Sequence, residues 1–147
     1  MKKNILVVVA HADDEVLGCG GTIARHVDQG DNVSVLFMAD GVSSRLESGS
    51  TDFFKRNSAR DEALGILGVK KWYALDFPDN QMDSIPLLKV IQAIERILDE
   101  VKPTRVYTHH FGDLNVDHKI TYQSVITACR PIPERSVCEL LTFEVMS

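Results

Sequence analysis

An unbroken apolar run, Ile5–Ala10, is the feature that most constrains the fold of this 147-residue chain. Six consecutive apolar residues, rich in valine, fit a strand that is buried on both faces, as strands of parallel sheets are. The rest of the chain alternates strand and helix patterns, which favours an α/β architecture. Strand patterns cover Asn4–Ala10, Asn32–Met38, Lys70–Leu75, Arg105–Thr108 and Glu139–Val145, and helix patterns cover Val16–Gln29, Asp52–Leu67, Ile85–Val101 and His118–Cys129.

This alternation predicts a doubly wound, three-layer α/β fold with a mostly parallel sheet of order 3-2-1-4-5 and helices on both faces. Gly30 and Gly68 stand where glycine commonly ends a helix, and Pro103 follows the third helix pattern. The length fits a single domain, residues 1–147. One long loop rich in glycine and serine, Asp40–Thr51, is a candidate mobile lid.

A histidine and three acids follow the first strand directly, as His11-Ala12-Asp13-Asp14-Glu15. Partly buried carboxylates beside an imidazole repel one another unless a cation or shared protons compensate. His11 and Asp14 can supply one nitrogen and one oxygen ligand to zinc, which leaves Asp13 to act on water. The simpler interpretation, an N-cap with acids in the first helical turn, needs only one acid and does not account for His11.

A second polar segment, His109–His118, follows the fourth strand. In the predicted strand order the first and fourth strands are neighbours, so both polar segments reach one crevice at the carboxyl edge of the sheet. A catalytic zinc takes three protein ligands, so the third comes from His109, His110 or His118. The residues alone favour His118 slightly and leave the other two open. Asp117 is a candidate catalytic residue that orients or polarises groups around the metal.

Composition restricts the partners and the compartment. Sixteen basic against 21 acidic residues give a net charge of −5, so there is no electrostatic case for a nucleic-acid partner. The start of the chain mimics a signal peptide, but its apolar run is too short, and no segment is long enough to span a membrane. Three scattered cysteines, Cys19, Cys129 and Cys138, indicate reduced thiols and a cytoplasmic location. The sequence is compatible with a homo-oligomer and does not specify the oligomeric state.

Two segments, AHADDEVLGCGGTIA from Ala10 and DLNVDH from Asp113, resemble the PIG-L/LmbE-like family of zinc-dependent N-acetylglucosamine de-N-acetylases. The resemblance continues through Arg56, the segment ALGILGV and Leu75–Asp79, so it covers nearly the whole chain. The fold of this family is Rossmann-like, in agreement with the alternation above.

The resemblance implies that His11, Asp14 and His118 bind Zn²⁺ and that Asp13 is the general base. Members of the family remove acetyl from an amino sugar carried on a lipid, a thiol precursor, an antibiotic or a polysaccharide. We therefore expect a hydrolase that acts on an N-acetylated sugar or glycoconjugate of the GlcNAc type and releases acetate and a free amine.

Several positions bear on the substrate. Arg56 and Asp79 are candidate contacts for sugar hydroxyls, with a structural surface pair as the alternative. Ala12 stands where the family commonly has proline, and Asn115 where it often has histidine. Asparagine can donate a hydrogen bond to an oxyanion but cannot deliver a proton, so proton delivery falls to Asp13 or to a neighbouring histidine. Family chains are usually longer, so we expect a C-terminal part of the pocket to be absent.

Two other functions stay open. A receiver-like signalling module also places acids after its first strand and binds magnesium, but Asp76 fits its phosphoacceptor position poorly, and a receiver does not account for His11 or His118. The other is a sugar-binding relic that keeps the deacetylase fold without turnover.

Overall fold

The computed structural model describes residues 1–41 and 50–146. Most of the predicted lid, Asp40–Thr51, therefore lies outside the described residues. Every predicted strand and helix is present, with ends that lie within two residues of the predicted ones. The elements are β1 (Asn4–Val9), α1 (Asp14–Asp28), β2 (Asn32–Ala39), α2 (Ser50–Ile66), β3 (Lys71–Phe77), the 3₁₀ turn η1 (Met82–Ser84), α3 (Leu87–Val101), β4 (Arg105–His109), α4 (Val116–Ala128) and β5 (Glu139–Phe143).

The five strands form one parallel sheet in the order β3-β2-β1-β4-β5, which confirms the predicted topology. β1 is the central strand, with Ile5 opposite Val33 of β2 on one side and Arg105 of β4 on the other. The run Ile5–Ala10 is completely buried. A central strand of a sheet covered on both faces is the one environment that matches this unbroken apolar run.

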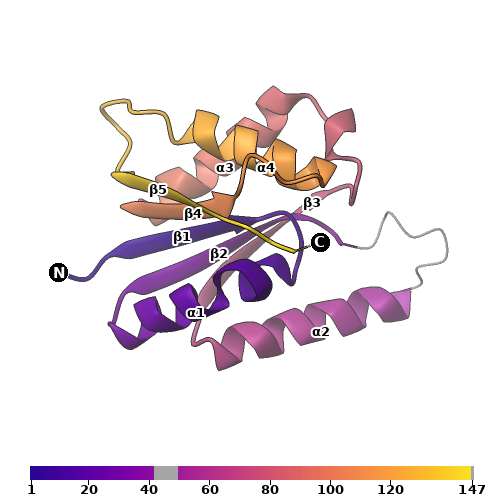
Figure 1. Cartoon of the computed structure of the whole chain (residues 1–147), viewed down its shortest axis with the longest axis horizontal. Coiled ribbons are helices and arrows are strands. Elements are labelled where there is room, and N and C mark those ends of the chain that lie inside the picture. The colour runs from indigo at the N-terminus through magenta and orange to yellow at the C-terminus, as the bar shows by residue number, and fades with distance from the viewer. Residues whose placement is uncertain (42–49, 147) are drawn as a thin grey trace.

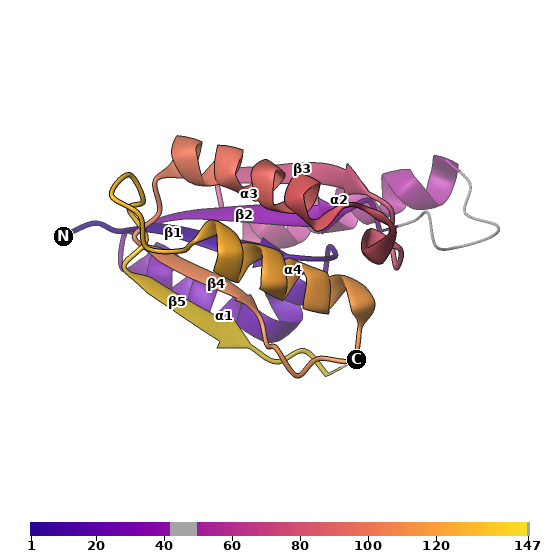
Figure 2. The same ribbon diagram turned by 90° about the horizontal axis from the view of Figure 1, so that it is seen from above.

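Helices cover both faces of the sheet, with α1 and α2 on one face and α3 and α4 on the other (Figures 1 and 2). Alternate side chains of β1 enter two separate cores. The core under α1 and α2 includes Ile5, Val7, Val9, Cys19, Ile23 and Leu64. The core under α3 and α4 includes Leu6, Val8, Ile94, Leu98 and Val125.

The carboxyl ends of β1 and β4 lie side by side at the centre of the sheet. The Thr108 hydroxyl donates to the Val8 carbonyl at 3.1 Å, and the Ala10 amide donates to Nε2 of His109 at 2.9 Å. The chain then leaves β1 into α1 on one face and leaves β4 into α4 on the other. The first turns of these two helices therefore frame one crevice. Among the described residues, no helix is both long and apolar enough to pass through a bilayer.

Candidate metal centre

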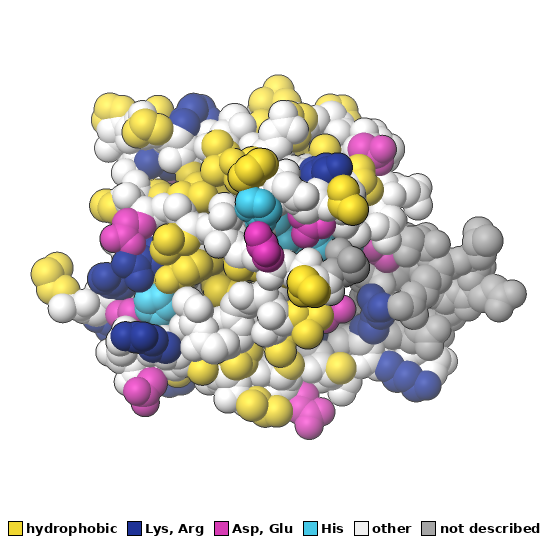
Figure 3. Space-filling view, in the orientation of Figure 1, with side chains coloured by type: hydrophobic (Ala, Val, Ile, Leu, Met, Phe, Trp, Pro, Cys, Tyr) yellow, Lys and Arg dark blue, Asp and Glu magenta, His cyan; other side chains and the backbone are white. Residues whose placement is uncertain are grey.

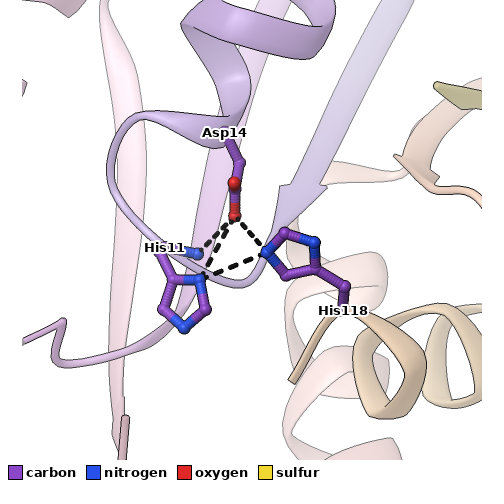
Figure 4. A group of neighbouring side chains, drawn as sticks. All are labelled: His11, Asp14 and His118. Atoms are coloured by element: carbon purple, nitrogen blue, oxygen red, sulfur yellow. Dashed lines mark hydrogen bonds and ion pairs between the residues drawn. The ribbon is translucent and has the colours of Figure 1, made fainter. Parts of the chain in front are cut away.

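Three side chains converge at the end of β1 (Figure 4). His11 lies in the turn after β1, Asp14 is the first residue of α1, and His118 lies in the first turn of α4. Oδ2 of Asp14 is 3.2 Å from Nε2 of His118 and 3.5 Å from Nδ1 of His11. These two ring nitrogens are 3.3 Å apart. Three donor atoms, two nitrogens and one oxygen, thus form a small and nearly equilateral triangle.

The size of this triangle suits one metal ion. A tetrahedral ion with bonds of about 2.0–2.1 Å, as zinc forms with nitrogen and oxygen, requires donor atoms about 3.3–3.4 Å apart. The observed separations of 3.2–3.5 Å agree with that requirement. Asp14 and His118 are almost completely buried, while His11 borders the solvent. Figure 3 shows histidine and acidic side chains side by side at the surface of this face of the molecule. The cluster can therefore hold a metal ion and keep one side open.

Each histidine ring turns its other nitrogen toward a carboxylate. Nδ1 of His118 is 2.7 Å from Oδ2 of Asp113, and Nε2 of His11 is 2.9 Å from Oδ2 of Asp117 and 3.0 Å from Oδ1 of Asp79. Carboxylates in this position fix the orientation and tautomer of a metal-binding histidine. Two further groups of side chains could also hold a metal ion: His109, Asp113 and His118, and His11, Asp79 and Asp117. Both groups contain the contacts between histidine and carboxylate that are described above.

Asp117 links the crevice to the segment after β3. It is fully buried, and its carboxylate accepts hydrogen bonds from the amides of Asn80 at 2.6 Å and Met82 at 3.1 Å. Burial opposes its ionisation, but the bonds from His11 and from these two amides outweigh burial and hold the pKa of Asp117 below its usual range. Asp117 is therefore a charged residue that positions His11 rather than a group facing the open side.

The charge balance of the cluster favours a cation. Burial alone lowers the pKa of His11, but Asp117, Asp14 and Asp79 raise it, to about 10. For Asp14, burial raises the pKa, but the close ring nitrogens of His109, His11 and His118 outweigh burial, so the pKa of Asp14 lies well below its usual range. With Asp113 the cluster holds four carboxylates, all of them buried or nearly so. A group of this composition requires either protonated imidazoles or a metal ion for neutrality.

The structure separates the three candidates for the third ligand. Only His118 turns a nitrogen toward both His11 and Asp14. His109 is fully buried and stacks on His118 with ring centroids 3.9 Å apart, while its Nε2 accepts the Ala10 amide. Burial lowers the pKa of His109, in keeping with a neutral ring. His110 belongs to none of the possible metal groups found among the described residues.

Asp13 faces the open side of the cluster. It occupies the N-cap position of α1 but makes no capping hydrogen bond with its side chain, and its φ of 149° is strained for a residue with a side chain. Its amide donates to the carboxylate of Glu15 at 2.9 Å, which accounts for the third acid of the motif. Burial and the neighbouring Asp14 raise the pKa of Asp13. The N-cap interpretation thus does not explain this side chain.

A pocket of about 380 Å³ lies over the cluster and is lined by His11, Asp13, Asp14, His118, Arg56, Asp79, Asn80, Asn115, Leu17, Val145 and Met146. The sequence predicts eight site residues, which are Asp13, Asn115, Asp117, His11, Asp14, His118, Arg56 and Asp79. All of them except Asp117 line this pocket. Arg56 reaches it from α2 and donates to the Gly41 carbonyl at 2.5 Å.

Asn115 caps the helix that carries His118. Its Oδ1 accepts the amides of Asp117 at 2.8 Å and His118 at 3.3 Å, and its Nδ2 donates to Oδ1 of Asn80 at 3.2 Å. The sequence reasoning did not single out Asp113 or Asn80. Asp113 opens the DLNVDH segment, so its proximity to a histidine five residues later was a usable signal. Asn80 has no such local signal.

Comparisons with known proteins agree with this geometry. The sequence profile of the PIG-L family, described as GlcNAc-PI de-N-acetylase, matches residues 6–129. An Escherichia coli protein named uncharacterized deacetylase YaiS is 35% identical over 138 residues, which cover 90% of this chain and 71% of that protein. A probable N-acetyl-alpha-D-glucosaminyl L-malate deacetylase 2 of Bacillus cereus is 29% identical over 142 residues, which cover 91% and 64% of the two chains.

One similar solved structure is the N,N'-diacetylchitobiose deacetylase from Pyrococcus horikoshii. It superposes with a TM-score of 0.76 at 30% sequence identity, over 86% of this chain and 49% of that one. The chain thus spans about half to seven-tenths of the lengths of these three proteins.

Proposed function

The chain belongs to the PIG-L family of GlcNAc-PI de-N-acetylases, and on that basis we propose that it is a zinc-dependent hydrolase of an N-acetylated amino sugar that releases acetate and a free amine. The observation that carries this proposal is the triangle of donor atoms from His11, Asp14 and His118, in which each ring is held by a carboxylate on its far side. Two of the similar proteins are named as deacetylases of an N-acetylglucosaminyl malate and of diacetylchitobiose.

The donor set suits zinc. Two imidazole nitrogens and one carboxylate oxygen are a common catalytic zinc set, and the open side leaves room for water and substrate. When bound, zinc supplies a Lewis acid that polarises the acetamide carbonyl and makes water more acidic. The chain's part is to hold the three donors in place, which Asp113 and Asp117 do through the far nitrogens of the two rings.

Asp13 is the proposed proton acceptor and donor. Its carboxyl group lies in the pocket beside the cluster, and burial together with Asp14 raises its pKa, which makes it a stronger base than a solvated aspartate. It takes the proton from the attacking water and returns it to the departing amine. Neither Asp14 nor Asp117 can do this, because each is engaged by histidine and its pKa is lowered.

The remaining pocket residues bind the substrate. One amide hydrogen of Asn115 is used by Asn80, and the second can donate to the oxyanion that forms when the carbonyl is attacked. Arg56 lines the pocket from α2 and is proposed to contact sugar hydroxyls. Asp79 lines it too and also contacts His11, so it joins the sugar site to the metal cluster.

Replacing Asp13 by asparagine separates the base from the ligands. Asp13→Asn should keep about one zinc per chain, yet lose about a hundredfold or more of the acetate released from N-acetylglucosamine or N,N'-diacetylchitobiose. His11→Ala should lose the metal itself. Asp28→Asn, on the exposed end of α1, is the matched control and should behave as the parent.

Two outcomes would contradict the proposal. If Asp13→Asn turns over as fast as the parent, another group takes the proton from water. If the parent binds zinc but releases no acetate from any N-acetylated sugar tested, the chain is a sugar-binding relic of the deacetylase fold.

A further inference from the structure

A groove of about 330 Å³ lies beside the candidate metal centre, between α2 and the outer part of β3. Its walls and floor include Arg56, Asn57 and Arg60 of α2 and Trp72, Ala74 and Asp76 of β3. Ala12, in the turn that also holds His11, lines its inner end, and Arg56 lines both this groove and the metal pocket. Arg56 therefore lies between the two hollows and contributes to the lining of each.

This part of the sheet is left open by the helices. Strands of parallel sheets are normally covered on both faces, and α2 runs along the same face as α1 (Figure 1). Even so, Trp72, Ala74 and Asp76 on that face are exposed, with 38% of the surface of Trp72 accessible to solvent. The alternate residues of β3 pack into the core under α3. Core packing thus does not explain the large aromatic side chain at the open face.

The aromatic side chain is held in a fixed place. The guanidinium of Arg60 lies 3.9 Å from the centroid of the Trp72 ring, and only 9% of the Arg60 side chain is exposed. Ala39 and Ala74 also line the groove. The groove therefore combines small apolar side chains with an aromatic ring that Arg60 supports from one side, a combination typical of ligand sites.

The charges of the groove favour a neutral and hydroxylated occupant. Its lining carries two guanidinium groups, Arg56 and Arg60, and two carboxylates, Asp40 and Asp76. Arg60 is also paired with Asp61 at 2.9 Å. A phosphate would meet the two carboxylates, and an acyl chain would bury polar groups without hydrogen bonds. A pyranose ring presents C–H groups to an aromatic face and hydroxyls to carboxylates and amides.

We propose that this groove binds the second saccharide unit of an N-acetylated glycan whose first unit occupies the metal pocket. Trp72 packs against the ring of the second unit, Asp76 accepts hydrogen bonds from its hydroxyls, and Asn57 can donate to or accept from them. Arg56 lies between the two units. The inference rests on the proposed function and specifies its substrate class: a saccharide of at least two units. Trp72 and Asp76 then determine specificity without taking part in the chemistry.

The chain contains a single tryptophan, so its fluorescence reports on this groove alone. Stopped-flow titration of the zinc-loaded protein with N,N'-diacetylchitobiose should give a saturable change in emission before turnover. N-acetylglucosamine at equal concentration should give little change. Asp76→Ala keeps the fluorophore and should weaken binding of the disaccharide at least fivefold. Leu88→Ala, at an exposed site on α3, should leave the affinity for the disaccharide unchanged. A saturable change with inorganic phosphate, and none with the disaccharide, would overturn the proposal.

Kinetics give a second measurement. Trp72→Ala should lower kcat/KM for the disaccharide about tenfold and leave that for N-acetylglucosamine within about twofold, while Trp72→Phe should retain most of the parent's preference. Equal losses on both sugars, or no loss on either, would refute the proposal that the groove binds a second saccharide unit. The two proposals can fail separately. Acetate release without an effect of Trp72→Ala would contradict only the saccharide site in the groove, and an emission change without acetate release would contradict only the deacetylase activity.

Discussion

Asp113 is expected to control metal affinity without binding the metal. Its Oδ2 lies 2.7 Å from Nδ1 of His118, and its Oδ1 accepts the Asn115 amide at 3.0 Å. Burial opposes its ionisation, but the bonds from His118 and Asn115 hold the pKa of Asp113 below its usual range. Asp113→Asn keeps the shape and one acceptor oxygen, but removes the charge that makes the opposite nitrogen of His118 a stronger ligand.

The size of the effect follows from the burial of this pair. Both side chains are at most 5% exposed, so water screens their interaction little. Losing a carboxylate that orients a metal-binding histidine typically costs 10–100-fold in affinity, or about 1.4–2.7 kcal/mol. We expect about tenfold for Asp113→Asn, which can still orient the ring, and about a hundredfold for Asp113→Ala. Asp14→Ala, which removes a donor atom, should exceed both.

Competition with a chromophoric zinc chelator measures these affinities directly. Asp28→Asn changes the net charge by the same amount at an exposed site and is the control. Thermal unfolding without metal shows whether each variant is folded. If folded Asp113→Asn binds zinc as tightly as the parent, the carboxylate does not support His118. If it loses zinc as completely as Asp14→Ala, Asp113 is itself a ligand.

Three further predictions concern the framework. Gly68→Ala should destabilise the fold by about 1–3 kcal/mol in urea unfolding, because φ is +76° and the new Cβ would lie 2.7 Å from Val27; an unchanged midpoint would contradict this. Asn115→Ala should cost about 1 kcal/mol through the lost cap and also lower turnover at least tenfold, whereas Asn115→Ser should restore stability alone. Burial raises the pKa of the Cys129 thiol to about 12, so mass spectrometry should find iodoacetamide on exposed Cys138 long before Cys129.

Most of the fold was predictable because its signals are local. The apolar run of β1, the i, i+3 and i+4 spacing of buried residues in α3, and glycine at helix ends each act over a few residues. The start of α4 was placed two residues late, at His118 instead of Val116. The helix begins earlier because Asn115 is its N-cap, and the Asn115 side chain accepts the amides of Asp117 and His118.

The hydrogen bonds that position the candidate metal-binding side chains were harder to predict, because they join segments that are distant in the sequence. Asp117 bonds to the amides of Asn80 and Met82, more than thirty positions earlier. His11 contacts Asp117, 106 positions later in the chain, where the neighbouring strands β1 and β4 end. No periodicity or spacing encodes such pairs. They arise only after the segment following β3 packs against the first turn of α4. The predicted strand order brings the two polar segments to one crevice, but it does not specify which side chains pair there.

The position of the cluster follows from the topology as much as from its ligands. α1 and α4 both begin at the crevice, and the positive ends of their dipoles stabilise anionic groups in the first turn. Asp14 and Asp117 occupy these first turns, so the fold favours their ionised forms although both are buried. Asp79 and Asp113 add further negative charge, so the total charge of the carboxylates exceeds the charge that the two helix ends compensate. The two imidazoles between these carboxylates present nitrogen atoms that can bind a cation. The switch point of this sheet therefore gathers negative charge at the ends of its helices, and His11 and His118 complete a cluster that could hold a metal ion.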